Sequence, residues 1–160
     1  MQNQITTALV SDIEGIQKLL NEVDALHLKL LPSHFKNLKN GRRKKEIEDW
    51  VLNKKCLYLV CKDGEEIIGI LNARIANTPT LPFIRKIKTM VIETLVVSKK
   101  KRNTGIGSEL LSHAEAWAIR KRAKRITLNV FVKNETAIEF YQNKRFKDVS
   151  VKMEKEIRSQ

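Results

Sequence analysis

The sequence predicts an α/β fold in which helices flank a central β-sheet. Strand-like and helix-like stretches alternate along its 160 residues, and no repeat or low-complexity segment interrupts them. Hydrophobic residues make up 42% of the chain, which is sufficient to fill one core of ordinary size. We therefore expect residues 1–160 to form a single domain.

The N-terminal part predicts a strand over residues 5–10 and then a long helix. Ser11 is a suitable helix cap, and Glu14 follows three residues later, as in a capping box. The helix has an apolar stripe that would pack on the sheet, formed by Ile13, Ile16, Leu19, Leu20, Val23 and Leu26. Residues 27–40 are irregular, and a short second helix is expected over residues 44–52.

The middle of the chain predicts a β-hairpin followed by a strongly apolar strand. Residues 56–62 and 67–76 are rich in strand-forming side chains, and an Asp63-Gly64 turn signal lies between them. These two strands should be antiparallel neighbours. After a proline-containing loop over residues 78–82, the run from Met90 to Val97 predicts the next strand.

The C-terminal third predicts two further helices and two further strands. The first helix covers residues 105–122, with one apolar face formed by Ile106, Leu110, Leu111, Ala114, Trp117 and Ala118. A strand over residues 126–132 and a helix over residues 134–144 follow. Residues 146–153 again have the character of a strand.

Cysteine and histidine usage argues against a disulfide or a metal site. Cys56 and Cys61 lie at the two ends of one predicted strand, and their odd separation places the thiols on opposite faces. We expect both to be buried, reduced and structural. The three histidines are scattered, so no metal-ligand spacing is present.

The N-terminus and the hydropathy predict a cytoplasmic protein that does not contact a membrane. The first residues lack the basic segment and apolar run of a secretion signal. No stretch approaches the roughly 20 apolar residues that a membrane span needs.

The net charge of +13 should attract anions to the surface, because 31 Lys and Arg stand against 18 Asp and Glu. Basic residues cluster at positions 42–45, 85–88, 99–102 and 120–125. This distribution leaves nucleic acid, anionic ligands and simple solubility open.

The passage from Val96 to Leu111 carries the clearest functional signal. A buried strand leads into a basic loop, and the loop passes through Gly105 and Gly107 into an amphipathic helix. Free amides at such a helix start, together with the helix dipole, favour a phosphate-sized anion. The spacing is not that of a dinucleotide-binding turn, because a leucine stands at position 110, and no P-loop lysine follows. The structural alternative is a tight turn beside a solvated charge run.

Two motifs in this order resemble the GNAT superfamily of N-acetyltransferases. Arg102-Asn103-Thr104-Gly105-Ile106-Gly107 matches the family signature Arg/Gln-x-x-Gly-x-Gly/Ala, and residues 128–141 with Phe146 match a second family segment. The resemblance implies a mixed, mostly antiparallel central sheet, flanked by helices and splayed between the fourth and fifth strands. The region before residue 56 matches only in outline.

The resemblance also implies a site for acetyl-CoA. The glycine-loop amides would hold the pyrophosphate, the preceding strand would pair with the pantetheine arm, and the cap of the last helix would reach that arm. The residues that carry these roles are Arg102, Asn103, Thr104, Gly105, Ile106, Gly107 and Ser108 in the loop, Leu95, Val96 and Val97 in the strand, and Asn134 at the helix cap. Lys99 replaces a proline that is frequent in the family. No metal is implied.

The catalytic candidates are Glu93 as the base and Tyr141 as the acid. Glu93 interrupts an apolar strand, where a carboxylate is costly unless it faces a cleft or a partner, and many family members have a glutamate there. The alternative is a solvated glutamate or one paired with a lysine. Tyr141 lies about two turns after Asn134 on the same helix face. The resemblance makes it the proton donor to the departing thiolate, although tyrosines are more often core aromatics.

Two positions depart from the family pattern. Asn129 stands where enzymes that acetylate ribosomal protein N-termini often have a glutamate base, which makes that substrate class less favoured. Arg145 stands where relatives usually have a glycine, so the last helix should end without the usual left-handed glycine cap.

Together these features predict transfer of an acetyl group from acetyl-CoA to a primary amine, by direct attack in a ternary complex. The amine, on a small molecule or a protein, would enter from the side of residues 27–40 and 78–82. The resemblance also allows a homodimer. Two rival functions remain. A nucleic-acid-binding module is disfavoured by the aromatic content of 6% and the lack of a docking motif. A non-catalytic coenzyme A sensor would keep the same fold.

Overall fold

A computed structural model describes residues 3–38, 44–77 and 82–157 of the chain. It divides into two compact units, Met1–Asn129 and Val130–Gln160. The first unit contains β1 (Gln4–Thr7), α1 (Ile13–Leu30), α2 (Lys44–Leu52), β2 (Cys56–Asp63), β3 (Glu66–Asn77), β4 (Lys88–Val97), α3 (Ile106–Arg120) and β5 (Arg125–Leu128), with short 3-10 helices η1 (Val10–Asp12) and η2 (Lys99–Lys101). The second unit contains α4 (Glu135–Asn143). The expectation of one domain stays a prediction.

The first unit is built on a five-stranded sheet with the order β1-β2-β3-β4-β5. The first three strand pairs are antiparallel, and β5 is parallel to β4. β5 pairs with β4 only from Thr89 to Ile92, whereas β4 continues to Val97. The predicted mixed, mostly antiparallel sheet that splays between its fourth and fifth strands is therefore confirmed.

A β-bulge in β4 lies where its pairing with β5 ends. Asn72 of β3 faces Thr94, and Ala73 faces Ile92, so Glu93 is an extra residue in β4. A bulge bends its strand and changes the direction of a side chain. This explains how an acidic residue fits in so apolar a strand.

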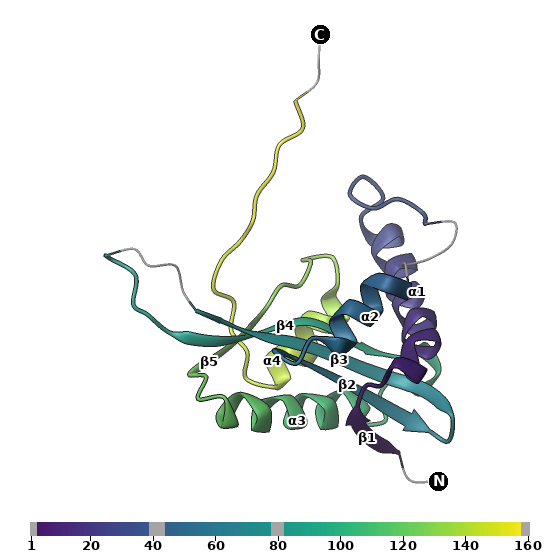
Figure 1. Ribbon diagram of the computed structural model, residues 1–160. Coiled ribbons are helices and arrows are strands. Elements are labelled where there is room, and N and C mark those ends of the chain that lie inside the picture. Colours follow the sequence, from purple (N-terminus) through teal and green to yellow (C-terminus); the bar gives the residue numbers. More distant parts are fainter. Residues whose placement is uncertain (1–2, 39–43, 78–81, 158–160) are drawn as a thin grey trace. The chain divides into compact units, whose positions relative to one another are not determined.

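Helices cover both faces of the sheet (Figure 1). α1 and α2 lie on one face, where Ile16, Leu20 and Ile47 share a buried cluster with Val60 and Ile70. α3 lies on the other face, and Leu110, Leu111 and Ala114 are fully or almost fully buried there. None of the helices in the described ranges is long and apolar enough to cross a membrane.

Gly69 of β3 allows α3 to approach the sheet closely. A Cβ atom at this position would lie 2.9 Å from Ile106 Cγ2 and 3.0 Å from Leu110 Cδ1. Both distances are shorter than the contacts that carbon atoms normally make. The missing side chain thus sets the depth of the first turn of α3, which is also the end of the glycine loop.

The start of α1 differs from the prediction. Ser11 was expected to cap the helix, but η1 precedes α1, and Asp12 takes the N-cap position. The Asp12 carboxylate accepts a hydrogen bond from the Leu9 amide at 2.9 Å and forms an ion pair with Lys62 at 2.6 Å. Ser11 lies inside η1, and the Asp12 side chain makes no capping hydrogen bond to α1 but binds the residue before η1 and a lysine of β2.

One of the two strands predicted near the C-terminus is shorter than expected, and the other does not form. The strand expected over residues 126–132 ends at Leu128, and residues 146–153 form no strand. Val149, Val151 and Met153 are 75–89% exposed. An alternating sequence favours extended backbone, but a strand also needs a neighbour to receive its main-chain hydrogen bonds, and no described segment pairs with this one.

The residue after the C-cap of α4 has a left-handed conformation, although it is an arginine and not a glycine. Arg145 has φ 66° and follows the C-cap Lys144. The Phe146 amide donates to the Tyr141 carbonyl at 3.0 Å, which closes the helix end. The predicted absence of a glycine cap is thus compensated by an arginine in a strained conformation.

Candidate functional site

The loop between β4 and α3 has an unusual main-chain conformation. Gly105 is the N-cap of α3 and has φ 90°, and Asn103 also lies in the left-handed region with φ 62°. A Cβ atom on Gly105 would meet nothing within 4 Å, so the backbone angle, and not the available space, explains the glycine. The Thr104 hydroxyl donates to the Lys101 carbonyl at 2.6 Å and fixes the loop from within.

The amides of residues 102–107 make no hydrogen bond to any group that the structure describes. The Ser108 amide, in contrast, donates to the Gly105 carbonyl at 2.9 Å. The unpaired amides lie at the positive end of the α3 dipole. Consecutive N–H groups in this position suit a diphosphate, which supplies several acceptor oxygens and negative charge.

The lysines of η2 are partly engaged by the protein. Lys101 Nζ forms an ion pair with Asp63 at 2.8 Å, and this carboxylate raises the pKa of Lys101. The Lys99 amide donates to Glu22 at 3.1 Å. Arg102 is exposed, and the one contact of its side chain with the described residues is a long one of 3.4 Å from Nε to the Val97 carbonyl. Arg102 is therefore better placed than Lys101 to meet an external anion.

The open edge of β4 presents the main-chain groups of Leu95 and Val97. Ser98 donates to the Ile68 carbonyl of β3 at 2.8 Å, and main-chain groups along an antiparallel strand alternate in direction. Those of Val96 therefore point toward β3, whereas those of Leu95 and Val97 point away from it. Of the three predicted strand residues, the outer two can pair with a ligand, and the Val96 side chain is buried.

Glu93 forms an ion pair with Arg74. Glu93 Oε1 accepts a hydrogen bond from Arg74 Nε at 2.6 Å, and the side chains are 33% and 45% exposed, respectively. The sequence left open a pairing of Glu93 with a lysine. Its partner is instead an arginine from the neighbouring strand. The bulge places both side chains on the same face of the sheet, where they remain open to solvent.

Two polar residues of β3 next to Glu93 were missed by the sequence analysis. Asn72 faces Thr94 across the strand pair and Tyr58 on the other side. Its Oδ1 atom is buried and has no hydrogen-bond partner among the residues that the structure describes. Arg74 follows on the same face, opposite Cys56. Polar side chains at positions 72 and 74 of the otherwise apolar 67–76 run were the signal that could have identified them.

The two thiols differ in exposure. Cys61 is buried beneath α3, close to Gly69, whereas Cys56 is partly exposed on the face that carries Arg74. Burial raises the pKa of both thiols. Both are free of disulfides, and the described residues contain no cluster of three potential metal ligands.

The second unit holds the remaining predicted site residues. Asn134 caps α4 as expected, since its side chain accepts a hydrogen bond from the Ala137 amide at 3.3 Å. Tyr141 packs edge-on against Phe140 and Phe146, with ring centroids 5.2 and 5.5 Å apart. Loss of solvent raises the pKa of Tyr141 to about 12. Their approach to acetyl-CoA stays a prediction.

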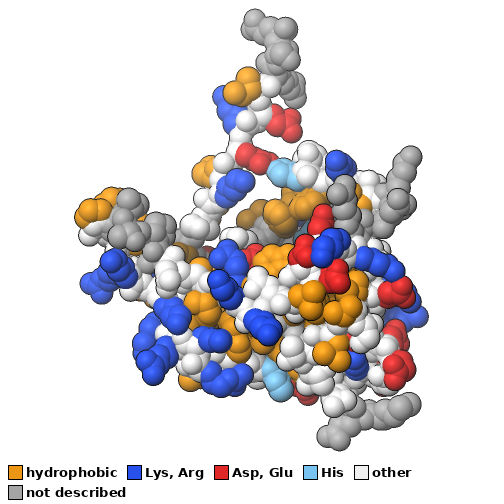
Figure 2. Space-filling model, viewed as in Figure 1, with side chains coloured by type: hydrophobic (Ala, Val, Ile, Leu, Met, Phe, Trp, Pro, Cys, Tyr) orange, Lys and Arg blue, Asp and Glu red, His pale blue; other side chains and the backbone are white. Residues whose placement is uncertain are grey.

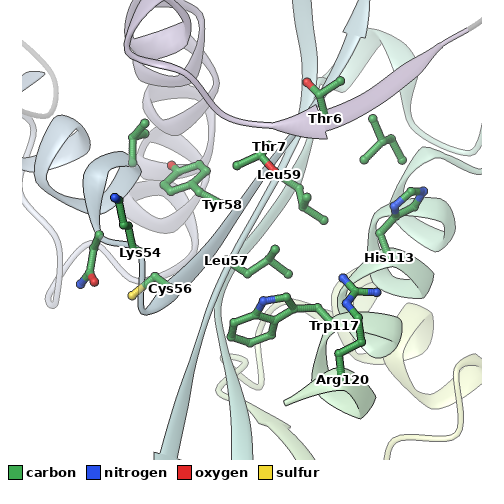
Figure 3. Close-up of a pocket in the computed structure, with 13 residues that line it drawn as sticks. Thr6, Thr7, Lys54, Cys56, Leu57, Tyr58, Leu59, His113, Trp117 and Arg120 are labelled. Carbon is green, nitrogen blue, oxygen red and sulfur yellow. The ribbon is translucent and has the colours of Figure 1, made fainter.

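A cavity of about 480 Å³ lies elsewhere in the first unit (Figure 3). His113, Trp117 and Arg120 of α3 face Leu57 and Leu59 of β2 across it. Further lining residues are Ile5, Thr6, Thr7, Val51, Asn53, Lys54, Cys56 and Tyr58. None of the predicted cofactor or catalytic residues lines this cavity.

A basic patch covers the end of α3 and the start of β5 (Figure 2). It contains the exposed residues Arg120, Lys121, Arg122, Lys124 and Arg125. Lys121 lies over the Trp117 ring at 5.6 Å. Arg42 and Arg43 of another predicted cluster, and residues 39–40 and 78–81 of the predicted amine entrance, lie outside the described residues.

A sheet that opens beside an amide-rich helix start is the arrangement that the sequence resemblance predicts for an acyl-group transferase. A family model described as the acetyltransferase (GNAT) family matches residues 23–146. The chain belongs to this family, and the resemblance seen in the sequence is confirmed.

Solved structures agree with this assignment. A tetramutant of the BH1408 protein from Bacillus halodurans has 25% identity and a TM-score of 0.89, with coverage of 98% of this chain and 100% of that one. A Pyrococcus furiosus protein with a provisional name as an acetyl transferase has 28% identity and a TM-score of 0.73, with coverage of 98% and 100%. Glucosamine-6-phosphate N-acetyltransferase from Arabidopsis thaliana, at 16% identity, TM-score 0.71 and coverage of 99% and 100%, shares the fold. A comparison with curated proteins found no match.

Proposed function

We propose that this protein transfers an acetyl group from acetyl-CoA to a primary amine within a ternary complex. The main support is the run of amides from residue 102 to residue 107, which have no acceptor among the described residues and lie at the N-terminus of α3. They lie beside a strand edge that β5 leaves open. A diphosphate and an amide-bearing arm fit these two features together.

The first unit supplies most of the proposed cofactor contacts. Arg102, Asn103, Thr104, Gly105, Ile106 and Gly107 offer main-chain amides to the pyrophosphate. Ser108 contributes through its hydroxyl, because its amide is already bonded to Gly105. Leu95 and Val97 pair with the arm, and Val96 holds the strand in register with β3. Asn134, at the start of α4, is the contact expected from the second unit.

The proposed chemistry needs one base and one acid. Glu93 accepts a proton from the ammonium group, directly or through water, so that the amine nitrogen can attack the thioester carbonyl. The N–C bond forms as the C–S bond breaks, and the main chain of β4 at its open edge polarises the carbonyl. Tyr141 then protonates the sulfur. A phenol with a pKa of about 12 carries its proton throughout the physiological range.

A thiol-release assay with acetyl-CoA and a panel of amines tests the proposal. Wild-type protein should release coenzyme A with at least one amine, and Glu93→Gln should reduce kcat by about 100-fold or more, the range for loss of a general base. Calorimetry with coenzyme A tests the loop separately. Gly107→Glu should abolish binding by placing a carboxylate among the amides, whereas Ser112→Glu, five residues further along α3, should leave the Kd for coenzyme A within about twofold of the wild-type value.

The rival functions make different predictions. A nucleic-acid-binding module would bind through the basic patch, and its affinity would fall steeply with salt concentration. A coenzyme A sensor would bind the cofactor but release no thiol with any amine. Unchanged turnover in Tyr141→Phe would refute the acid assignment alone. A homodimer and a cytoplasmic location remain parts of the proposal that size measurements and fractionation would test.

A further inference from the structure

We propose that the acceptor is a zwitterionic amine, which carries a carboxylate or phosphate group a few bonds from its nitrogen. Arg74 would bind the anionic group while Glu93 receives the amine. This inference rests on the proposed function, because it assigns the acceptor to the site where Glu93 acts as the base. It adds Arg74 as the residue that determines acceptor specificity.

The geometry of the ion pair leaves binding capacity on both partners. Only Arg74 Nε and Glu93 Oε1 are joined, at 2.6 Å. The two Nη groups of Arg74 and Oε2 of Glu93 have no partner in the described ranges of the chain. A guanidinium presents its N–H groups as a planar fork that matches two oxygens of a carboxylate or phosphate. Arg74 can therefore receive an anion without releasing Glu93.

The charge balance favours a zwitterion over a simple cation. Arg74 already compensates the charge of Glu93, and the whole chain has a net charge of +13. A polyamine or an aminoglycoside would bring further positive charge next to a guanidinium. A zwitterion places its ammonium group near Glu93 and its anion near Arg74, so each charge meets its opposite.

Asn72 provides a second, independent sign of a polar ligand on this face. It lies two residues before Arg74 and opposite Thr94, the neighbour of Glu93. The residue is only 5% exposed, and its Oδ1 atom finds no donor in the described parts of the chain. A buried acceptor without a donor costs about 1–3 kcal/mol. Asn72 therefore adds an acceptor with no donor among the described residues to the face on which Glu93 and Arg74 lie.

Matched amine pairs test the inference with acetyl-CoA and the full chain. Phenylalanine is compared with phenethylamine, and O-phosphoethanolamine with ethanolamine, so that carboxylate and phosphate are distinguished. The anionic member of at least one pair should have a kcat/KM about tenfold or more above that of its partner. In Arg74→Met this ratio should fall toward one through a higher KM for the anionic amine. Arg74→Lys should give an intermediate ratio.

Arg120→Met is the matched control, because it removes an exposed arginine from α3, on the opposite face of the sheet. It should leave the ratio unchanged. Equal kcat/KM values for the two amines of each pair overturn the inference, and so does a ratio that is unchanged in Arg74→Met. In either case the observed release of coenzyme A still supports the proposed transferase. If Arg74→Met lowers kcat/KM equally for both amines of a pair, Arg74 acts only as the partner of Glu93, and this result also overturns the inference. Absence of coenzyme A binding overturns both proposals.

Discussion

Substitution of Gly69 by alanine should disturb both the stability of the protein and its cofactor loop. The new methyl group would lie 2.9 Å from Ile106 Cγ2, 3.0 Å from Leu110 Cδ1 and 3.3 Å from Cys61 Cβ. Carbon atoms prefer separations of about 3.5–4.0 Å, so α3 must move outward by roughly 0.5–1 Å. Ile106 cannot avoid the contact by rotating a distant end group, because Cγ2 is attached directly to its Cβ atom.

The size of the effect follows from the crowding. Overpacking of this kind typically costs about 1–3 kcal/mol in the free energy of unfolding. For a chain of this length, that corresponds to a decrease in Tm of about 5 °C for a loss of 2 kcal/mol. Because Ile106 is the first residue of α3, the same movement displaces the amides of residues 102–107. We expect the Kd for coenzyme A to rise by about fivefold to tenfold, a loss of about 1 kcal/mol.

Gly15→Ala is the control for this experiment. Its Cβ would lie 2.9 Å from Ile67 Cδ1 and 3.0 Å from Ile67 Cγ1, so the crowding is similar, but it lies between α1 and β3. Coenzyme A binding should stay as in the wild type, as calorimetry would show. Thermal melts of both variants complete the comparison. A Gly69→Ala protein with an unchanged Tm and Kd, or equal weakening of coenzyme A binding in both variants, would refute the role given to Gly69.

Three further predictions concern single side chains. Tyr141→Phe should make the free energy of unfolding less sensitive to alkali. The pKa of Tyr141 is about 12 in the folded protein and about 10 when unfolded, so its contribution to stability is complete below pH 10 and is lost as the pH rises toward 12. Urea titrations at pH 11 should show the wild type losing about 1 kcal/mol more than the variant. Arg145→Gly should raise the free energy of unfolding by roughly 0.5–1 kcal/mol, because glycine adopts φ 66° without strain, and a decrease in Tm would contradict this. Asn72→Leu should raise stability by about 1 kcal/mol in urea while lowering kcat/KM for the acceptor, and unchanged activity would remove Asn72 from the acceptor site.

Local patterns predicted the elements well where the chain carries its own signal. The Asp63-Gly64 turn fixed the β2–β3 hairpin, and the apolar run from Met90 to Val97 became β4. Asn134 caps α4 with its side chain, as its position before the helix indicated. These outcomes depend on turn chemistry, hydrophobic periodicity and capping, which act between residues close in sequence.

Predictions failed where a distant partner decides the outcome. Ser11 lies inside η1 and does not begin α1, and the side chain of Asp12 bonds to the Leu9 amide and to Lys62 of β2 instead of capping the helix. Residues 146–153 alternate like a strand, but strand formation depends on a neighbour that the pattern does not specify. Arg74 was overlooked because its importance comes from a carboxylate on the adjacent strand.

The sequence by itself determined the order of the elements, the glycine loop and the family, because these depend on residue types at short spacing. Only the tertiary structure decided that the amides of residues 102–107 find no acceptor among the described residues, which edge of β4 is open and what Glu93 contacts. Those features arise when segments far apart in the chain come together in one sheet. Register and a single β-bulge thereby turned an acidic residue in an apolar strand into one half of a charged pair that faces solvent.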